Sequence, residues 1–432
     1  MKAISHLIIG NENGNTEKRN IIWNMIGSFI YAFASMVLSI AVVRIAGEDA
    51  GGIFNFAFPT FGQHMFMVAY FGIRPFQITD TGNRYTFGEY RGLRYYTCAF
   101  AIVVALFYVG MNSYRYSMEK SLTIMLLVLY KVIDALADTY EAEFQRVGKL
   151  YLTGKSNAFR TIFSVAVFLT VLTMTKDLVT ASFAAVLAQI AGFFVFDSMI
   201  IRELPNIDWS CGKKKRWLLL KDNTLLFFSV ILDFYIFSAS KYAVESCMLD
   251  KDMAVYGAIF MPTSVINLVA GFVIRPYMTK LALSWEMKRY DHFKKIIRNL
   301  FLIISALTVL AVGGAWLLGI PVLSLLYSNI GYALSSCRPA LILIILGGAF
   351  NAFMNLFYYA LVIMKKQRYI FIGYGAALVV ALLISNPFVE HGGLLGGAAS
   401  YLCLMAVLMV IFAVSAIFFI KKAERRDPMD GE

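Results

Sequence analysis

Twelve apolar blocks, each close to 20 residues long, run through the sequence and constrain what it can fold into. A helix of about 20 residues, rising 1.5 Å per residue, crosses a hydrocarbon core of roughly 30 Å. None of the blocks alternates apolar with polar residues, as the strands of a membrane β-barrel do. The sequence therefore predicts an all-α integral membrane protein with twelve transmembrane helices, at residues 21–43, 51–72, 95–112, 121–141, 157–175, 178–200, 223–243, 254–276, 299–320, 339–362, 369–386 and 394–420.

The overall composition agrees with this prediction. Hydrophobic residues make up 59% of the 432 residues and charged residues only 15%, whereas a soluble chain carries about 25% charged residues. The chain has too few polar side chains to cover a water-facing surface. A set of soluble domains is therefore excluded.

The basic residues predict the orientation of the chain. With the N-terminus inside, 30 of the 39 Lys and Arg residues fall in cytoplasmic segments and six on the opposite side. This bias follows the positive-inside rule, so we expect both tails, 1–20 and 421–432, to be cytoplasmic. The polar first 20 residues predict no removable signal peptide. The net charge of +12 is explained by loops facing anionic lipid, and it requires no nucleic-acid partner.

A short motif occurs twice and indicates an internal repeat. Residues 71–76 (FGIRPF) and 272–277 (FVIRPY) share four of six positions, and both follow a Pro-Thr pair within their predicted helix. Six predicted helices separate the copies, so both run in the same direction through the membrane. Such a parallel repeat is typical of two-lobed transporters. The sequence predicts an N-lobe at 21–200, a basic inter-lobe loop at 201–222 and a C-lobe at 223–420.

Motifs of the common enzyme classes are missing from the sequence. There is no His-Glu-x-x-His and no Gly-x-x-x-x-Gly-Lys-Ser/Thr, and the five cysteines are isolated. Asp134 and Asp138 have a spacing that can hold a metal on one helix face, but no second carboxylate pair accompanies them. We therefore predict that the protein is not an enzyme and has no catalytic residue, metal or cofactor.

Charged residues within the predicted membrane spans are the strongest candidates for function. Lys131, Asp134, Asp138 and Glu141 are spaced by three or four residues, which places them on one face of the fourth helix. Each charge near a helix centre costs about 2.5–3.5 kcal/mol to insert, so these residues should face protein or a wet cavity. Two interpretations are open: an internal Lys131–Asp134 bridge with packing, or a substrate or proton pathway.

Milder features occur in other helices. The first helix carries a row of small or polar residues, for which helix packing is the favoured interpretation. Its members are Asn24, Ser28, Tyr31, Ser35 and Ser39. Pro59 and Pro262 lie inside the second and eighth predicted helices, where each removes a backbone hydrogen bond and permits bending.

The second half of the chain resembles the Wzx-type polysaccharide flippases. The residues that carry the resemblance are KYAV at 241–244, YGAIFMPT at 256–263, VINL at 265–268, RPYMTKLA at 275–282, GIPVLSLLY at 319–327, LGGAFNA at 346–352 and MKKQ at 364–367. These flippases belong to the superfamily that also contains multidrug-and-toxin extruders (MATE). The resemblance implies two six-helix lobes forming a V in a bacterial cytoplasmic membrane. It also implies a polyprenyl-pyrophosphate-linked oligosaccharide as cargo, and other polysaccharide-assembly membrane proteins as potential partners.

The candidate site residues follow from the chemistry of such a cargo. An anionic diphosphate requires cations at depth, and a hydrogen-bonding side chain can support them. The predicted substrate-binding residues are Arg275, Lys241, Arg74, Lys131, Arg44 and Asn267, and the predicted ion-coupling residues are Asp134, Asp138 and Asp233. Two alternatives stay open. A drug or small-cation antiporter of the same superfamily would use the carboxylates, whereas a polysaccharide polymerase would need larger outer loops.

Overall fold

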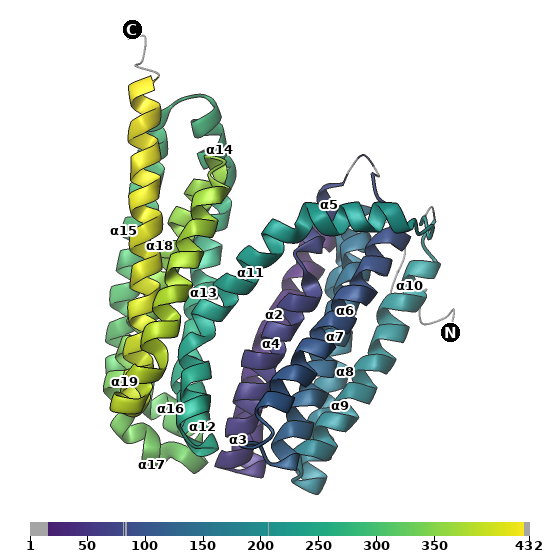
Figure 1. Cartoon of the computed structure of the whole chain (residues 1–432), viewed down its shortest axis with the longest axis vertical. Helices are drawn as coiled ribbons and strands as arrows, with labels where there is room; N and C mark the ends of the chain where they lie inside the picture. The colour runs from purple at the N-terminus through teal and green to yellow at the C-terminus, as the bar shows by residue number, and fades with distance from the viewer. Residues whose placement is uncertain (1–15, 81, 83, 206, 427–432) are drawn as a thin grey trace. The chain divides into compact units, whose positions relative to one another are not determined.

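The computed structural model describes residues 16–80, 82, 84–205 and 207–426, and every regular element in these ranges is helical (Figure 1). The chain divides into two compact units, residues 1–231 and 232–432. The elements of unit 1 are α2 (Thr16–Ala46), α3 (Glu48–Phe56), η1 (Ala57–Gly62), α4 (Gln63–Tyr70), α5 (Ile73–Thr79), α6 (Phe87–Met111), α7 (Met118–Arg146), α8 (Leu150–Thr175), α9 (Leu178–Gly192), η2 (Phe193–Ser198), α10 (Met199–Arg202) and most of α11 (Lys213–Cys247).

Unit 2 contains the end of α11 and the remaining helices. These are α12 (Asp250–Phe260), α13 (Pro262–Ile274), η3 (Arg275–Tyr277), α14 (Met278–Glu286), α15 (Tyr290–Gly314), η4 (Ala315–Gly319), α16 (Ile320–Leu326), η5 (Ser328–Ile330), α17 (Gly331–Leu334), η6 (Ser335–Cys337), α18 (Arg338–Ile363) and α19 (Gln367–Arg426). The boundary between the units lies within α11. Lys213 begins this helix, so the second half of the predicted 201–222 loop is helical.

The membrane-spanning character expected from the sequence is clear in the helices. Within the described ranges, nine helical segments are long and apolar enough to cross a membrane. The predicted spans 51–72 and 121–141 are helical as well, within α3–α4 and α7. The predicted spans 369–386 and 394–420 both fall in α19, whose backbone departs from helical geometry at Gly393 (φ 54°, ψ −136°). The total of twelve crossings stays a prediction.

The two prolines of the repeated motif mark interruptions in otherwise regular helices. Pro59 lies in η1, a π-helix between α3 and α4, and Pro262 begins α13 directly after α12 ends. Proline has no N–H to donate, which makes local rearrangement of the hydrogen-bond ladder favourable. The threonine after each proline bonds back to its own helix: Thr60 donates its hydroxyl to the Asn55 carbonyl at 3.0 Å, and Thr263 donates to the Phe260 carbonyl at 2.7 Å.

The repeated hexapeptides differ in local conformation. Phe71 and Gly72 both adopt positive φ angles, of 52° and 66°, so the helix breaks there before α5 begins. In the second copy the chain stays helical through Ile274, and residues 275–277 form the single turn η3. Glycine at the second position of the first copy permits the left-handed backbone, whereas Val273 in the second copy does not.

The helix starts in unit 1 follow from capping residues. Thr86 and Glu89 form a reciprocal capping box at the start of α6. The hydroxyl of Ser117 accepts from the Lys120 backbone at the start of α7, and the carboxylate of Asp177 accepts from the Thr180 backbone at the start of α9. These caps satisfy backbone N–H groups at the starts of α6, α7 and α9 that have no partner within the helix.

Helices α2 and α8 pack closely through glycine. A Cβ atom added to Gly154 would lie 2.1 Å from the carbonyl oxygen of Trp23, and one added to Gly27 would lie 2.4 Å from the carbonyl oxygen of Gly154. The backbones therefore touch, as is typical where small residues mediate helix contacts in membranes. At one end of the pair, the Asn20 side chain donates to the Gly148 carbonyl at 3.0 Å and accepts from the Tyr151 backbone at 2.8 Å.

An aromatic cluster positions α7 within unit 1. The ring of Tyr140 contacts the edges of Phe87 and Phe193, each at 5.1 Å between ring centroids. Tyr151 and Phe144 belong to the same buried cluster. Ala137, Tyr140 and Phe144 therefore anchor α7 in this cluster, and Asp138 and Glu141 each follow one of these residues directly in the helix.

Candidate functional site

Arg160 of α8 is the centre of a buried cluster of charges in unit 1. Its side chain is 1% exposed and contacts three carboxylates. One terminal nitrogen donates to Asp134 Oδ1 at 3.0 Å and Glu141 Oε1 at 2.9 Å, and the other donates to Asp197 Oδ2 at 2.6 Å. Asp197 also accepts from the Ser156 hydroxyl at 2.5 Å. The planar fork of arginine suits this arrangement, because it directs several N–H groups at once.

Two further arginines converge on Asp138 of α7. Arg94 of α6 is fully buried and donates to Asp138 Oδ2 at 3.1 Å. Its other N–H groups donate to the Thr139 hydroxyl at 2.5 Å and the Ala69 carbonyl at 2.7 Å. Arg74 of α5 donates to Asp138 Oδ1 at 2.5 Å. The Asp138 carboxylate is thus held from two sides.

We call this set of side chains the arginine–carboxylate network. It comprises Arg74, Arg94, Arg160, Asp134, Asp138, Glu141 and Asp197. Three guanidinium groups face four carboxylates, and Lys131 of α7 interacts electrostatically with Asp134. With Lys131 included, positive and negative groups balance. Such a balance is what permits charges to be buried.

The predicted Lys131–Asp134 bridge is not formed. Lys131 lies 4.2 Å from the centre of the Phe58 ring and donates to the Tyr31 hydroxyl at 3.4 Å, while Asp134 takes its close contacts from Arg160 and from Gln189 Nε2 at 2.9 Å. Arginine on α8 competes better for the carboxylate because it offers more N–H donors.

A second group of contacts continues from the network toward the loop after α5. Gln77 donates to Glu143 Oε2 at 2.9 Å, and Arg146 pairs with Glu143 at 2.6 Å. Arg146 also donates to the carbonyl of Tyr85 and lies 3.9 Å from Asp80. These contacts attach the loop to the last turns of α7.

Asp80 is the charged centre of this loop. Burial opposes its ionisation, but hydrogen bonds from the backbone of Tyr85 and Arg84 and from the Tyr90 hydroxyl outweigh burial and lower the pKa of the Asp80 carboxyl. The ionised form therefore stabilises the folded state above the unfolded pKa, near 3.9, and this stabilisation is lost as the pH falls through the folded pKa.

We expect Asp80→Asn to lower the thermal unfolding midpoint of the detergent-purified protein at pH 7. The difference from the wild type should shrink as the pH falls below about 4, because the wild-type carboxyl is then protonated. The matched control is Glu203→Gln at an exposed position, which should leave the midpoint unchanged throughout. A difference for Asp80→Asn that is constant with pH would contradict the assignment.

Unit 2 holds a buried cation of a different kind. Lys241 of α11 is 9% exposed, and its ammonium lies 4.0 Å from the centre of the Phe260 ring and 5.8 Å from that of Phe237. The Tyr401 ring packs on both phenylalanines, at 4.7 and 5.6 Å. Among the described residues no carboxylate lies within ion-pair distance of Lys241. The contacts that its ammonium makes are with aromatic faces.

The remaining predicted residues are separate from one another. Asp233 of α11 is half-buried and interacts electrostatically with Tyr358 and Tyr374. Asn267 of α13 accepts from Asn351 Nδ2 of α18 at 2.8 Å. Arg275 in η3 and Arg44 in the last turn of α2 are exposed.

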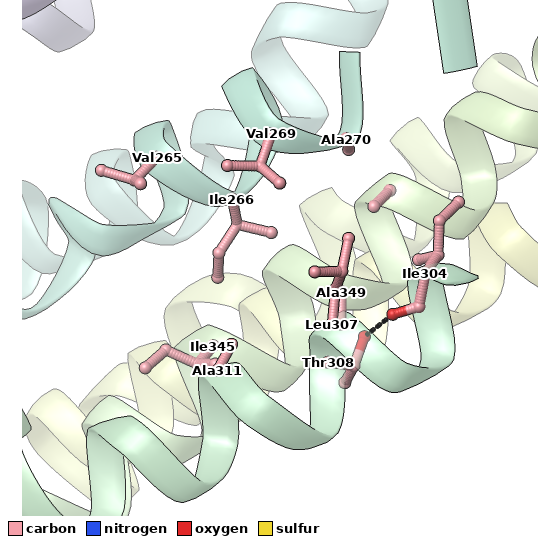
Figure 2. Close-up of a pocket in the computed structure, with 11 residues that line it drawn as sticks. Val265, Ile266, Val269, Ala270, Ile304, Leu307, Thr308, Ala311, Ile345 and Ala349 are labelled. Atoms are coloured by element: carbon pink, nitrogen blue, oxygen red, sulfur yellow. Dashed lines mark hydrogen bonds between the residues drawn. The ribbon is translucent and has the colours of Figure 1, made fainter. Parts of the chain in front are cut away.

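An apolar cavity of about 220 Å³ lies between α13, α15 and α18 in unit 2 (Figure 2). Val265, Ile266 and Val269 face it from α13, opposite side chains of α15 and α18. Its one polar lining side chain is Thr308, whose hydroxyl donates to the Ile304 carbonyl at 2.8 Å within its own helix. The cavity therefore offers a hydrocarbon-like surface with no demand for a hydrogen bond.

The structure assembles some predicted residues and adds others that the sequence reasoning missed. It joins Arg74, Asp134 and Asp138 in one network and places Lys241, Asp233 and Asn267 in the other unit. Glu141, singled out on the same helix face as Asp134 and Asp138, also joins this network, and the members that were missed are Arg94, Arg160 and Asp197. Charges inside or at the ends of apolar segments were the signal that could have found them.

No protein-family model and no curated protein sequence matches the chain. A multidrug resistance MATE family transporter of the MOP superfamily, solved in an inward-facing conformation, superposes with a TM-score of 0.58 at 13% identity, covering 94% of this chain and 99% of that one.

Two other solved structures give similar values. A eukaryotic MATE transporter has a TM-score of 0.56 at 12% identity, covering 98% of this chain and 97% of its own. A MOP superfamily transporter from Pyrococcus furiosus has a TM-score of 0.58 at 12% identity, covering 97% and 98%. The chain has the MATE transporter fold. This confirms the predicted fold class, and the likeness at such low identity concerns the fold alone.

Proposed function

We propose that the protein is an alternating-access flippase that moves a polyprenyl-pyrophosphate-linked oligosaccharide from the inner to the outer leaflet of a bacterial cytoplasmic membrane. In this proposal Lys241 binds the pyrophosphate, with Arg275 as a second cation. Other polysaccharide-assembly membrane proteins would supply and receive the cargo. The proposal combines a transporter fold with a site whose charge suits an anion.

The observation that carries the proposal is the environment of the buried Lys241 side chain. A buried ammonium against aromatic rings, with no carboxylate in ion-pair range among the described residues, can accept an anionic ligand without first breaking an ion pair. A phosphate oxygen would replace the hydration that the ammonium lost on burial. A cationic drug would instead be repelled at this position.

The carboxylates of unit 1 support the same preference. Asp134, Asp138 and Glu141 are each paired with arginine in the network. A cation would have to displace a guanidinium group to reach them. The network is therefore a poor cation site, and an ion-coupling role for Asp134 and Asp138 would require the network to open.

The apolar cavity between α13, α15 and α18 suits the polyprenyl part of the cargo, because a hydrocarbon chain needs no polar partner there. The fold itself does not determine the charge of the cargo. The Pyrococcus furiosus transporter is described as having a binding pocket of reverse polarity, which suggests a different function for that protein.

The test is flipping of a fluorescent polyprenyl-pyrophosphate oligosaccharide in proteoliposomes, measured by quenching of the outer leaflet. Lys241→Met should slow flipping by at least about tenfold, since a charge-assisted hydrogen bond contributes about 1.5–3 kcal/mol. Lys241→Arg should retain part of the rate. Lys251→Met, at an exposed lysine, is the control. Near-normal flipping by a folded Lys241→Met protein would refute the proposal.

The antiporter alternative rests on Asp233, a half-buried carboxylate with no cation in ion-pair range among the described residues. The same vesicles distinguish the two functions. Under this alternative, the wild type would exchange an organic cation for protons that move down their gradient. Asp233→Asn would abolish that exchange, whereas Lys241→Met would not.

A further inference from the structure

A second cavity lies at the start of α15 and the end of α19 in unit 2, far in sequence from Lys241. Its volume is about 320 Å³, and α18 contributes Phe357 to its wall. The two helices can be followed in Figure 1 at the side of unit 2 that carries the yellow helix α19. We call this cavity the α15–α19 groove.

The groove has a basic end and an apolar end. On α15, Lys294 and Arg298 are followed one turn later by Phe301 and Leu302, and on α19 Lys421 is preceded one turn earlier by Ile417. This spacing places each cation and its apolar neighbours on the same helix face. The groove therefore separates charge from hydrocarbon along its length, as an amphiphile does.

The basic end keeps a net positive charge. Lys294 pairs with Asp291 at 2.8 Å and with Glu424 at 2.6 Å, so the Lys294–Glu424 pair links α15 to α19 beside the groove. Arg298 and Lys421 are exposed, and neither has an ion pair among the described residues. These two cations are available to a ligand.

The apolar walls are exposed. Phe301 is 39% exposed, Leu302 59% and Ile417 49%. In a membrane such a surface contacts acyl chains, and a basic pocket between helices is a recognised binding feature for anionic lipid head groups. A soluble phosphate would leave the apolar part of the groove unused.

We propose that the α15–α19 groove binds one anionic phospholipid, with Arg298 and Lys421 on its phosphate and an acyl chain against Phe301, Leu302 and Ile417. This site is independent of the proposed transport function. It binds a lipid of the surrounding membrane and involves neither Lys241 nor the arginine–carboxylate network.

Native mass spectrometry of the full chain in detergent tests the site, with phosphatidylglycerol and phosphatidylcholine as probes. We expect the wild type to retain phosphatidylglycerol preferentially. The double variant Arg298→Gln/Lys421→Gln should weaken phosphatidylglycerol binding about 30-fold, since each cation near a phosphate contributes about 1 kcal/mol. Phosphatidylcholine binding should change little.

The matched control is Lys251→Gln/Lys280→Gln, which removes the same charge from exposed positions outside the groove. It should bind phosphatidylglycerol as the wild type does. Equal retention of the two lipids by the wild type, or equal losses in the two double variants, would overturn the site. Displacement of the lipid by glycerol phosphate at the same concentration would also overturn it, because the acyl chain would then add nothing.

Discussion

Arg160→Leu is expected to lower the free energy of unfolding by about 3–5 kcal/mol, a large part of the stability of an ordinary domain. The substitution leaves Asp134, Glu141 and Asp197 buried without their shared cation. Uncompensated buried charge is far more costly than the loss of one contact. The measurement is thermal unfolding in detergent, together with the yield of monodisperse protein.

Two companion variants separate charge from geometry. Arg160→Lys keeps the charge but loses the fork that reaches all three carboxylates, so it should fall between the wild type and Arg160→Leu. Adding Asp197→Asn to Arg160→Leu should recover part of the loss. Arg425→Leu, at an exposed arginine, is the control. An Arg160→Leu protein as stable as this control would show that the network contributes nothing to stability.

Gly154→Val is expected to be at least as damaging, by about 3 kcal/mol or more. Its side chain would meet the backbone of Trp23 and Asn24 at 2.1 to 2.6 Å, and backbone cannot move aside as a flexible side chain can. Overpacking ordinarily costs about 1–3 kcal/mol, and here α2 would have to separate from α8. The unfolding midpoint and the fraction of monodisperse protein measure the effect.

The matched comparison is Gly110→Ala near the end of α6, where an added Cβ atom would meet nothing within 4 Å. That substitution should leave stability unchanged or raise it slightly, because alanine is the better helix former. Equal stability of the Gly154→Val and Gly110→Ala proteins would show that α2 and α8 can separate at no cost.

The all-helical fold could be predicted because hydropathy reports helix length directly when the solvent is lipid. The positions at which the helices begin could not be predicted in this way. The predicted span 95–112 belongs to a helix that begins at Phe87, and the predicted span 157–175 belongs to one that begins at Leu150. The added turns carry buried polar side chains, with Arg94 in one and Ser156 in the other. A hydropathy pattern excludes such turns, although partners on other helices make them stable.

The candidate site was predicted only in part, because the sequence shows spacing within one helix but not contacts between helices. The helical spacing correctly placed Asp134, Asp138 and Glu141 on one face of α7, because that spacing is a local property. Their partners are not local. Arg94 directly precedes the predicted span 95–112 and Arg160 lies near the start of the predicted span 157–175, positions typical of the cytoplasmic membrane surface, whereas the structure buries both inside helices. The charge bias across the predicted membrane remains strong without them.

The arginine–carboxylate network also has a consequence for how the chain enters the membrane during synthesis. Arg94 emerges before its partner Asp138, Asp134 emerges before Arg160, and Asp197 emerges last. A helix released alone into lipid would carry each unpaired charge at about 2.5–3.5 kcal/mol. Helices α6 to α9 should therefore wait beside the insertion machinery and leave it as a group, with the completion of η2 as the event that releases them.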